Sequence, residues 1–295
     1  MALTVAPLHD AVGVELSGLD LEDGAQPAAV ETLRDRVHRH GCALMRGQSL
    51  PPPALARLGR ALGEPLPPFR PQYSLPGFPE IIGVGNLVED GEVVAYLNRG
   101  GIEWHSDSPG SSRPPEVSLL YCLESVLPDG GGETGFASTV SGYRALPDAL
   151  KARIETLELV HSFNTFNDQV ARYDESTVPT QAGGLRARNR DTSDPIVQRH
   201  PATGARHLYV SHAMVKRIPG MDRAEGMALV MEVVDRATAP DLIYKHVWQA
   251  GDLMVFDNRG CLHTPFPYAY DDFPRTRRLL HQIIVGGRAS SVPDI

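Results

Sequence analysis

The stretch GIEWHSDSPGSS contains a histidine and an aspartate two positions apart, His105 and Asp107. Residues two apart in an extended chain point to the same side, so both side chains could bind one metal ion. Two histidines and one carboxylate on octahedral Fe(II) leave three neighbouring positions open, enough for a bidentate oxoacid and dioxygen. Because the chain has 11 histidines, this pair alone is weak support for a metal site. A distant third ligand is required.

His263 is the candidate for that third ligand. It is the isolated histidine at the end of GDLMVFDNRGCLH, where a strand pattern runs into a turn. The next strand pattern, RRLLHQIIVGG, begins with Arg277 and Arg278. Guanidinium groups suit bidentate pairing with a carboxylate. These residue types favour a metal centre that also binds an organic acid.

Strand patterns dominate the central and C-terminal parts of the chain. Runs rich in valine, isoleucine, leucine and tyrosine occur at 42–47, 79–86, 116–124, 205–212, 252–260 and 277–287. Helical spacing of apolar residues predicts two surface helices ahead of the other elements, at 28–41 and 51–63, and further helices at 147–158 and 222–238. The stripe of Met227, Val230 and Val234 in the last helix is interpreted as core packing. The predicted fold class is mainly β with flanking helices.

Length and composition are compatible with one large domain over 1–295. A net charge of −8 provides no basic field for nucleic acid or an anionic membrane surface. The three cysteines, Cys42, Cys122 and Cys261, have no Cys-x-x-Cys spacing and indicate reduced thiols. With no signal peptide and no apolar run long enough for a membrane span, we expect a cytoplasmic protein.

The segment 169–195 is polar, charged and almost without periodicity. A loop of this length in a compact domain is often an active-site lid. A flexible surface insertion has the same composition. The sequence does not separate these two interpretations.

Several segments together make the chain similar to the TauD/TfdA family of Fe(II)- and 2-oxoglutarate-dependent dioxygenases. The segments are VGVELSGLDL, HGCALMRGQSL, LGRALGEP, EWHSDSPGSSRPPEVSLLYCLESVLPDGGGETGFAS, HPATGARHLYV, GDLMVFDNRGCLH and RRLLH. They extend almost from end to end, which makes the signal far stronger than one short motif. The resemblance implies a double-stranded β-helix, the jelly roll of cupin-like proteins, with helices packed outside it.

The resemblance also implies the roles of five residues. His105, Asp107 and His263 match the family's iron ligands, and Thr134 matches the threonine that helps to hold 2-oxoglutarate. The family pattern of an arginine, two apolar residues and a histidine fits RLLH, which makes Arg278 the 2-oxoglutarate arginine. Strand alternation places Arg278 on the opposite face from Arg277, the fallback.

The substrate residues are less defined. Family members that act on taurine carry a second arginine where this chain has Gln282, and an amide cannot neutralise a sulfonate. The segment RPQY places Arg70 and Tyr73 where relatives keep a polar substrate-binding pair. Arg70 is therefore the candidate anchor for an anionic substrate, and its alternatives are Tyr96, Asn98 and Arg99.

The implied reaction converts 2-oxoglutarate and dioxygen to succinate and carbon dioxide while an unactivated C–H bond of a small organic substrate is hydroxylated. Desaturation, ring formation and cleavage stay open, as does the choice between a dimer and a tetramer. A metal-dependent hydrolase could use the same three ligands around zinc, and a non-catalytic jelly-roll binding module needs none. The hydrolase has no use for Thr134 and Arg278, and a halogenase would need a small residue in place of Asp107.

Overall fold

The structure is a computed structural model that describes residues 3–19, 21, 26–68, 70–89, 91–96, 103–107, 115–126, 130–162, 164–165, 191–268 and 275–286. Its framework is two packed β-sheets. The large sheet contains, in spatial order, β1 (Thr4–Pro7), β2 (Val14–Ser17), β3 (Cys42–Met45), β17 (Leu253–Asp257), β9 (Pro115–Glu124), β19 (Leu279–Gly286), β6 (Phe78–Gly85) and β5 (Ser74–Leu75), with β4 (Glu64–Pro65) beside β19. The small sheet contains β16 (Ile243–His246), β10 (Thr134–Ser138) and β18 (Cys261–Pro265).

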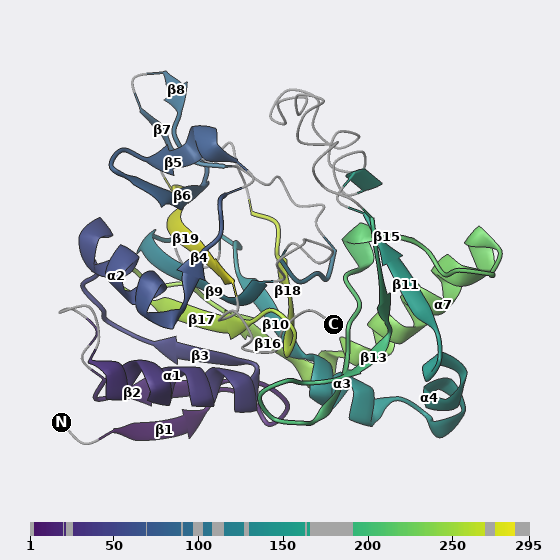
Figure 1. The fold of residues 1–295 in the computed structure, drawn as a ribbon. Coiled ribbons are helices and arrows are strands. Elements are labelled where there is room, and N and C mark those ends of the chain that lie inside the picture. Colours follow the sequence, from purple (N-terminus) through teal and green to yellow (C-terminus); the bar gives the residue numbers. More distant parts are fainter. Residues whose placement is uncertain are drawn as a thin grey trace.

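Alternation along the strands divides the large sheet into two apolar faces. One face packs against the small sheet, where Phe256 and Leu280 meet Phe136 in a buried cluster. The other face packs against two helices, α1 (Pro27–His40) and α2 (Pro52–Leu62), seen on the left of Figure 1. Two sheets packed face to face with helices outside are the expected jelly roll, so the predicted fold class is confirmed.

A third apolar cluster lies on the other side of the small sheet, on the right of Figure 1. Its helices are α3 (Thr139–Ala145), α4 (Asp148–Ile154) and α7 (Arg223–Ala237). Its strands are β11 (Glu158–His161), β13 (Val197–Arg199), β14 (Arg206–Leu208) and β15 (Val215–Arg217), and β12 (Thr192–Pro195) pairs with β11. The remaining elements are the hairpin of β7 (Val88–Glu89) and β8 (Glu92–Val93) and the 3-10 turns η1 (Pro71–Tyr73), η2 (His212–Met214) and η3 (Pro240–Leu242).

Three local expectations need correction. The strands β1 and β2 come before the first helix, α3 was not predicted, and the strand expected at 205–212 is only three residues long. All are short elements whose stability comes from pairing or packing with distant parts of the chain, which a local pattern does not record. Most of the segment 169–195 lies outside the described residues, and its last residues form β12, paired with β11.

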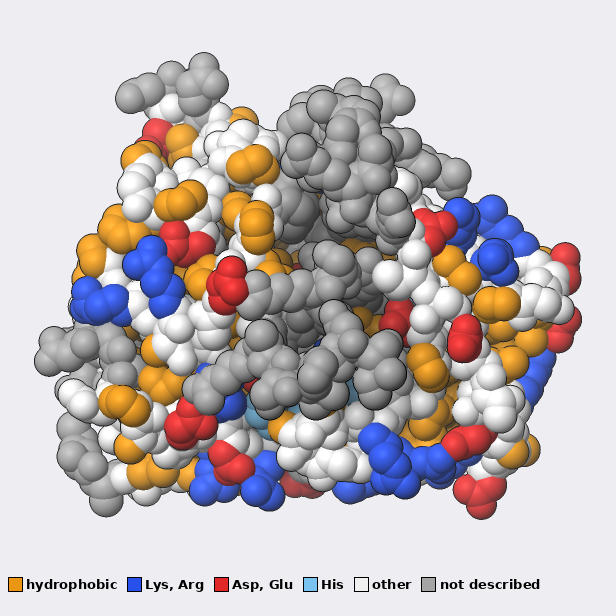
Figure 2. Space-filling model, in the orientation of Figure 1, with side chains coloured by type: hydrophobic (Ala, Val, Ile, Leu, Met, Phe, Trp, Pro, Cys, Tyr) orange, Lys and Arg blue, Asp and Glu red, His pale blue; other side chains and the backbone are white. Residues whose placement is uncertain are grey.

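Charged side chains of both signs lie near one another along the lower rim of the face shown in Figure 2. Within the described residues, no helix is both long and apolar enough to cross a membrane. The predicted ligand His263 belongs to β18 of the small sheet.

Candidate metal centre

Strand pairing brings His105 and His263 together. The two residues form an isolated antiparallel bridge, in which each backbone N–H donates to the carbonyl of the other at 3.0 and 2.8 Å. Their ring centroids lie 4.2 Å apart. The His263 ring is also packed against Phe256, at 4.6 Å between centroids. The backbone thus fixes both imidazoles at the rim of the small sheet.

Asp107 completes a group of three potential ligands. One ligand atom from each of His105, Asp107 and His263 lies within 4.8 Å of the others. The Asp107 Oδ1 and His263 Nε2 atoms are 3.8 Å apart, which is too far for a hydrogen bond. The side chains therefore converge without bonding to each other, and this leaves their lone pairs available to a metal ion.

The electrostatics of the group favour a bound cation. Burial lowers the pKa of His105 and of His263 from 6.5 to about 3, so both rings are neutral at pH 7. Burial also raises the pKa of the Asp107 carboxyl, because its charge is removed from water. The Glu103 carbonyl accepts a hydrogen bond from His105 Nδ1 at 2.8 Å, and His105 Nε2 therefore carries the free lone pair. A divalent ion would satisfy all three groups.

Thr134 lies close to the same rim. It is the first residue of β10 and pairs with Pro265, two positions after His263. The indole Nε1 of Trp248 donates a hydrogen bond to Thr134 Oγ1 at 2.9 Å. Because an indole nitrogen only donates, the hydroxyl proton of Thr134 remains available for an acidic ligand.

The arginines at the start of β19 lie on opposite faces. The Arg278 side chain is buried, and its guanidinium carbon lies 5.8 Å from the centre of the Tyr268 ring. Arg277 is partly exposed and forms an ion pair with Glu124, with Nη2 3.1 Å from Oε1. Arg278 is thus the arginine that faces the interior, the orientation that strand alternation predicts.

Three of the predicted substrate residues form one group. The Arg70 side chain is 1% exposed, and its guanidinium carbon lies 4.9 Å from the centre of the Tyr96 ring. The rings of Tyr73 and Tyr96 are 6.0 Å apart. Asn98 and Arg99 lie outside the described residues. The structure therefore adds an aromatic partner to Arg70 but does not test the other two.

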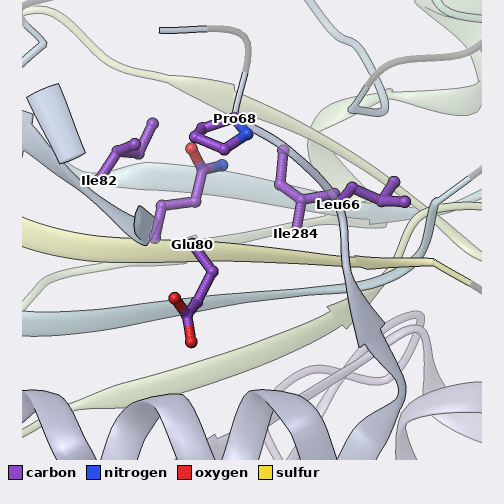
Figure 3. A pocket seen from close by; sticks show the side chains of 6 residues that line it. Leu66, Pro68, Glu80, Ile82 and Ile284 are labelled. Carbon is purple, nitrogen blue, oxygen red and sulfur yellow. The ribbon is translucent and has the colours of Figure 1, made fainter. Parts of the chain in front are cut away.

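Gln282 connects the triad to a small pocket. Its Nε2 lies 3.5 Å from Asp107 Oδ2. The pocket is lined by Leu66, Pro68, Glu80, Ile82, Gln282 and Ile284 (Figure 3). In Figure 3 the carboxylate of Glu80 points away from Leu66 and Pro68, and it forms an ion pair with Arg60 of α2. The lining near Gln282 is therefore mainly apolar.

Sequence reasoning missed three polar or aromatic residues at this centre: Ser118, Trp248 and Asn258. Ser118 Oγ donates to Asp107 Oδ2 at 2.6 Å, and Asn258 Oδ1 accepts from the Asp107 backbone N–H at 3.1 Å. A serine inside the apolar run EVSLLYCLE was an available signal, since polar residues in buried strands need a partner. Trp248 had no local signal that separates it from an ordinary core aromatic residue.

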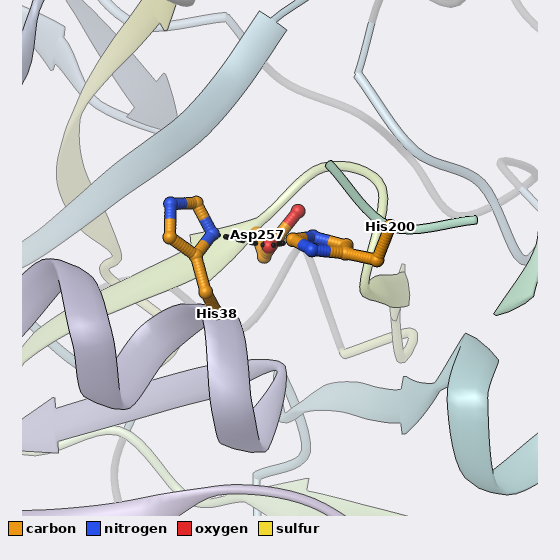
Figure 4. Close-up of side chains that lie close together, drawn as sticks. All are labelled: His38, His200 and Asp257. Carbon is orange, nitrogen blue, oxygen red and sulfur yellow. Dashed lines mark hydrogen bonds and ion pairs between the residues drawn. The ribbon is translucent and has the colours of Figure 1, made fainter. Parts of the chain in front are cut away.

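A second group of two histidines and one aspartate is centred on Asp257, the residue directly before Asn258. His38 Nδ1 and His200 Nε2 are 2.6 and 2.7 Å from the same atom, Asp257 Oδ2 (Figure 4). His38 Nε2 is 3.1 Å from Glu116 Oε1, so both nitrogens of this ring donate to carboxylates. The ligand atoms of this group are therefore already used in hydrogen bonds to one another and to Glu116.

The chain matches the profile of the family described as "Taurine catabolism dioxygenase TauD, TfdA family" over residues 4–283. It is 28% identical to an alpha-ketoglutarate-dependent sulfate ester dioxygenase of Pseudomonas putida, over 97% of this chain and 90% of that protein. It is 31% identical to an (S)-phenoxypropionate/alpha-ketoglutarate-dioxygenase of Sphingobium herbicidovorans, over 72% and 74% of the two chains.

Among solved structures, a taurine dioxygenase from Burkholderia xenovorans superimposes with a TM-score of 0.77 at 26% identity, over 97% of this chain and 90% of that one. This agreement extends the sequence match to the three-dimensional arrangement of the sheets. Two histidines and an aspartate at the rim of the small sheet fit the iron that such enzymes require. The chain belongs to the TauD/TfdA family and is an Fe(II)- and 2-oxoglutarate-dependent dioxygenase.

Proposed function

We propose that this chain hydroxylates an unactivated C–H bond of a small organic carboxylate, such as an amino acid derivative or a pathway intermediate, with Fe(II) held by His105, Asp107 and His263. The observation that carries the proposal is the 3.8 Å separation of Asp107 Oδ1 and His263 Nε2 in a site shielded from solvent. Bound iron supplies the oxidising chemistry, with 2-oxoglutarate and dioxygen as cosubstrates. The protein's own residues hold the metal, orient the acids and exclude water.

Thr134 and Arg278 are proposed to bind the distal carboxylate of 2-oxoglutarate. Both side chains are buried, and the Thr134 hydroxyl proton is not used by Trp248. The Arg278 guanidinium packs over the Tyr268 ring, 5.8 Å from its centre, and this contact helps to hold the side chain in place. A carboxylate that meets a guanidinium away from water gains a charge-assisted hydrogen bond, which is stronger there than in solvent.

The paired arginines test this assignment. We expect Arg278→Ala to raise the half-saturating 2-oxoglutarate concentration about 30-fold or more, since losing a buried charged partner costs about 2 to 5 kcal/mol. Arg277→Ala is the matched control, because its ion pair with Glu124 is partly exposed and should contribute little. The reverse pattern would make Arg277 the cosubstrate residue.

Gln282 and Arg70 support the proposed substrate class. Gln282 lies beside Asp107 and offers an amide without charge, so a sulfonate placed there would be buried without a counterion. Arg70 offers a positive charge held against Tyr96, and it is proposed to bind the anionic end of the substrate. The Sphingobium relative is named for a carboxylate substrate, (S)-phenoxypropionate, which is compatible with this proposal.

The experiment is made in two steps. Anaerobic Fe(II) should produce a weak visible absorption only when 2-oxoglutarate is present, and its absence would remove the proposed centre. Small carboxylates and sulfonates are then compared for the succinate formation that they stimulate. Arg70→Ala should raise the half-saturating concentration of the best carboxylate roughly tenfold, the value of one charged hydrogen bond. An unchanged value would exclude Arg70 from the site and favour an uncharged substrate or Arg99.

We further infer a cytoplasmic enzyme with a small-molecule partner. Cys42, Cys122 and Cys261 are all buried and free, which suits a reducing compartment. The dimer or tetramer suggested by the family resemblance stays a prediction, and light scattering of the purified protein would decide it.

A further inference from the structure

The two oxygens of the Asp107 carboxylate have different surroundings. Oδ2 accepts a hydrogen bond from Ser118 Oγ at 2.6 Å and has Gln282 Nε2 at 3.5 Å. Oδ1 is the oxygen that faces His263 Nε2, 3.8 Å away. The protein therefore occupies one oxygen and directs the other toward the position between the ligands.

Asn258 determines the direction of the Ser118 hydrogen bond. Its side-chain oxygen accepts from the Asp107 backbone N–H at 3.1 Å, so its amide nitrogen must point the other way. That nitrogen donates to Ser118 Oγ at 2.8 Å. Because a serine hydroxyl has one proton, Ser118 can then donate only to Asp107. Asn258 thus holds both the backbone and, through Ser118, the carboxylate of Asp107.

The turn that carries Asn258 is itself fixed. The Asn258 backbone N–H donates to the Glu116 carbonyl at 2.9 Å. Asp257 Oδ1 accepts from the backbone N–H groups of Arg259 and Gly260, at 2.8 and 2.9 Å. Ser118 and Asn258 are 0% and 3% exposed, so water does not compete for these hydrogen bonds. A buried, fully bonded chain of polar groups therefore ends at one oxygen of Asp107.

We propose that Ser118 and Asn258 are positioning residues that act as one relay and turn Asp107 so that Oδ1 alone binds the metal. The inference rests on the proposed function, since it assumes that His105, Asp107 and His263 hold the ion. Neither residue belongs to the group of three potential ligands, and each acts through its hydrogen bond to Asp107. Their contribution is to the affinity and geometry of the metal site, because outer partners orient the ligands that bind a metal.

The test measures Mn(II) binding, without 2-oxoglutarate or turnover, by the electron paramagnetic resonance signal of free and bound ion. Ser118→Ala and Asn258→Ala should each weaken Mn(II) binding by about 10- to 100-fold. The double variant should bind Mn(II) no more weakly than the single variant with the lower affinity, because two members of one relay are not independent. Each variant should also change the spectrum of the bound ion, which loss of stability alone would not do.

Ser138→Ala is the matched control. Ser138 is also a buried serine on a strand, but its Oγ accepts from the Ser141 backbone N–H at the start of α3. This variant should have a lower melting temperature than the wild type and the same Mn(II) affinity. A cooperative thermal unfolding transition of each metal-free variant shows that the variant is folded. If Asn258→Ala does not fold, the result for Ser118→Ala alone decides.

Unchanged Mn(II) affinity in Ser118→Ala would overturn the relay, as would losses that multiply in the double variant. Failure of the proposed function has a different signature. In that case the wild-type protein binds no Mn(II), or His105→Ala binds it as tightly as the wild type does. If Mn(II) binding is lost in His105→Ala but unchanged in Ser118→Ala, the metal centre is supported and only the relay is contradicted.

Discussion

Two groups in this protein have the same composition, two histidines and one aspartate, but different states. In the group of His38, Asp257 and His200, each histidine forms a hydrogen bond to Asp257 Oδ2, with nitrogen–oxygen distances of 2.6 and 2.7 Å. In the group of His105, Asp107 and His263, the Asp107 Oδ1 to His263 Nε2 distance is 3.8 Å. The members of the first group, which we call the closed group, are hydrogen-bonded to one another. Asp107 and His263 in the second group are not.

The pKa values show the same contrast. Burial by itself would lower the pKa of His38, but hydrogen bonds to Asp257 and Glu116 outweigh it and raise that pKa to about 9. For His105 and His263 burial prevails, and their pKa values fall to about 3. His38 therefore carries the cation that its group needs. His105 and His263 are neutral, so this group has no cation of its own, and a bound metal ion would supply the positive charge that Asp107 lacks.

The largest expected effect comes from Asp107→Ala. Turnover should fall below detection, because the metal loses its only carboxylate ligand among the three residues. The fold should survive, since a jelly-roll core is built without the metal. Metal content and thermal melting of the purified variant check both parts. Full activity would contradict the assignment of the triad.

Asp257→Ala should behave in the opposite way. It removes the shared acceptor of His38 and His200 and leaves a buried imidazolium with only Glu116. Breaking such a buried pair costs about 3 to 5 kcal/mol of stability, measurable by urea unfolding of the metal-free protein. A loss below about 1 kcal/mol would mean that this group is not a structural ion pair.

The two groups should also respond to pH in opposite directions. The pKa of His38 is about 9 in the folded protein and about 6.5 in the unfolded chain, so its stabilisation is complete below pH 6.5 and is lost as pH rises to about 9. His105 and His263, with pKa values of about 3, oppose folding as pH falls from 6.5 toward 3. Each pKa unit corresponds to about 1.4 kcal/mol.

The free energy of unfolding of the metal-free protein, measured across this pH range, reports both changes: the alkaline limb, where stability falls above pH 6.5, and the acid limb, where it falls below pH 6.5. His38→Gln should flatten only the alkaline limb, and His263→Gln only the acid limb. If His38→Gln left the alkaline limb unchanged, the raised pKa of that histidine would be wrong.

The smallest effect concerns metal binding by the closed group. His38→Gln should leave one Mn(II) bound per chain and change its affinity less than about threefold, because the hydrogen bonds of His38 go to Asp257 and Glu116 and not to any of the three ligands. Equilibrium dialysis with Mn(II) or Zn(II) checks the number. A second bound ion in the wild type that disappears in His38→Gln would show that the closed group also binds metal.

The sequence predicted the long elements of the fold better than the short ones. Apolar runs identified β9, β17 and β19, whose residues are buried on both faces of the large sheet. The four-residue strands β1 and β2 were missed, since their stability comes from pairing with each other and with β3. A short strand on the edge of a sheet leaves little periodicity to detect.

By itself the sequence determined local geometry. The spacing of His105 and Asp107 and the alternation of Arg277 and Arg278 follow from the two-residue repeat of an extended chain. The family resemblance grouped His105 and His263 with Asp107, but nothing in the sequence indicated that His38 and His200 share Asp257 or how closely the atoms of either group approach. That was decided by tertiary structure, because the bridge between His105 and His263 and the approach of α1 to Asp257 join residues far apart in the chain. The separation of ligand atoms, and with it the difference between a metal centre and an ion pair, exists only after folding.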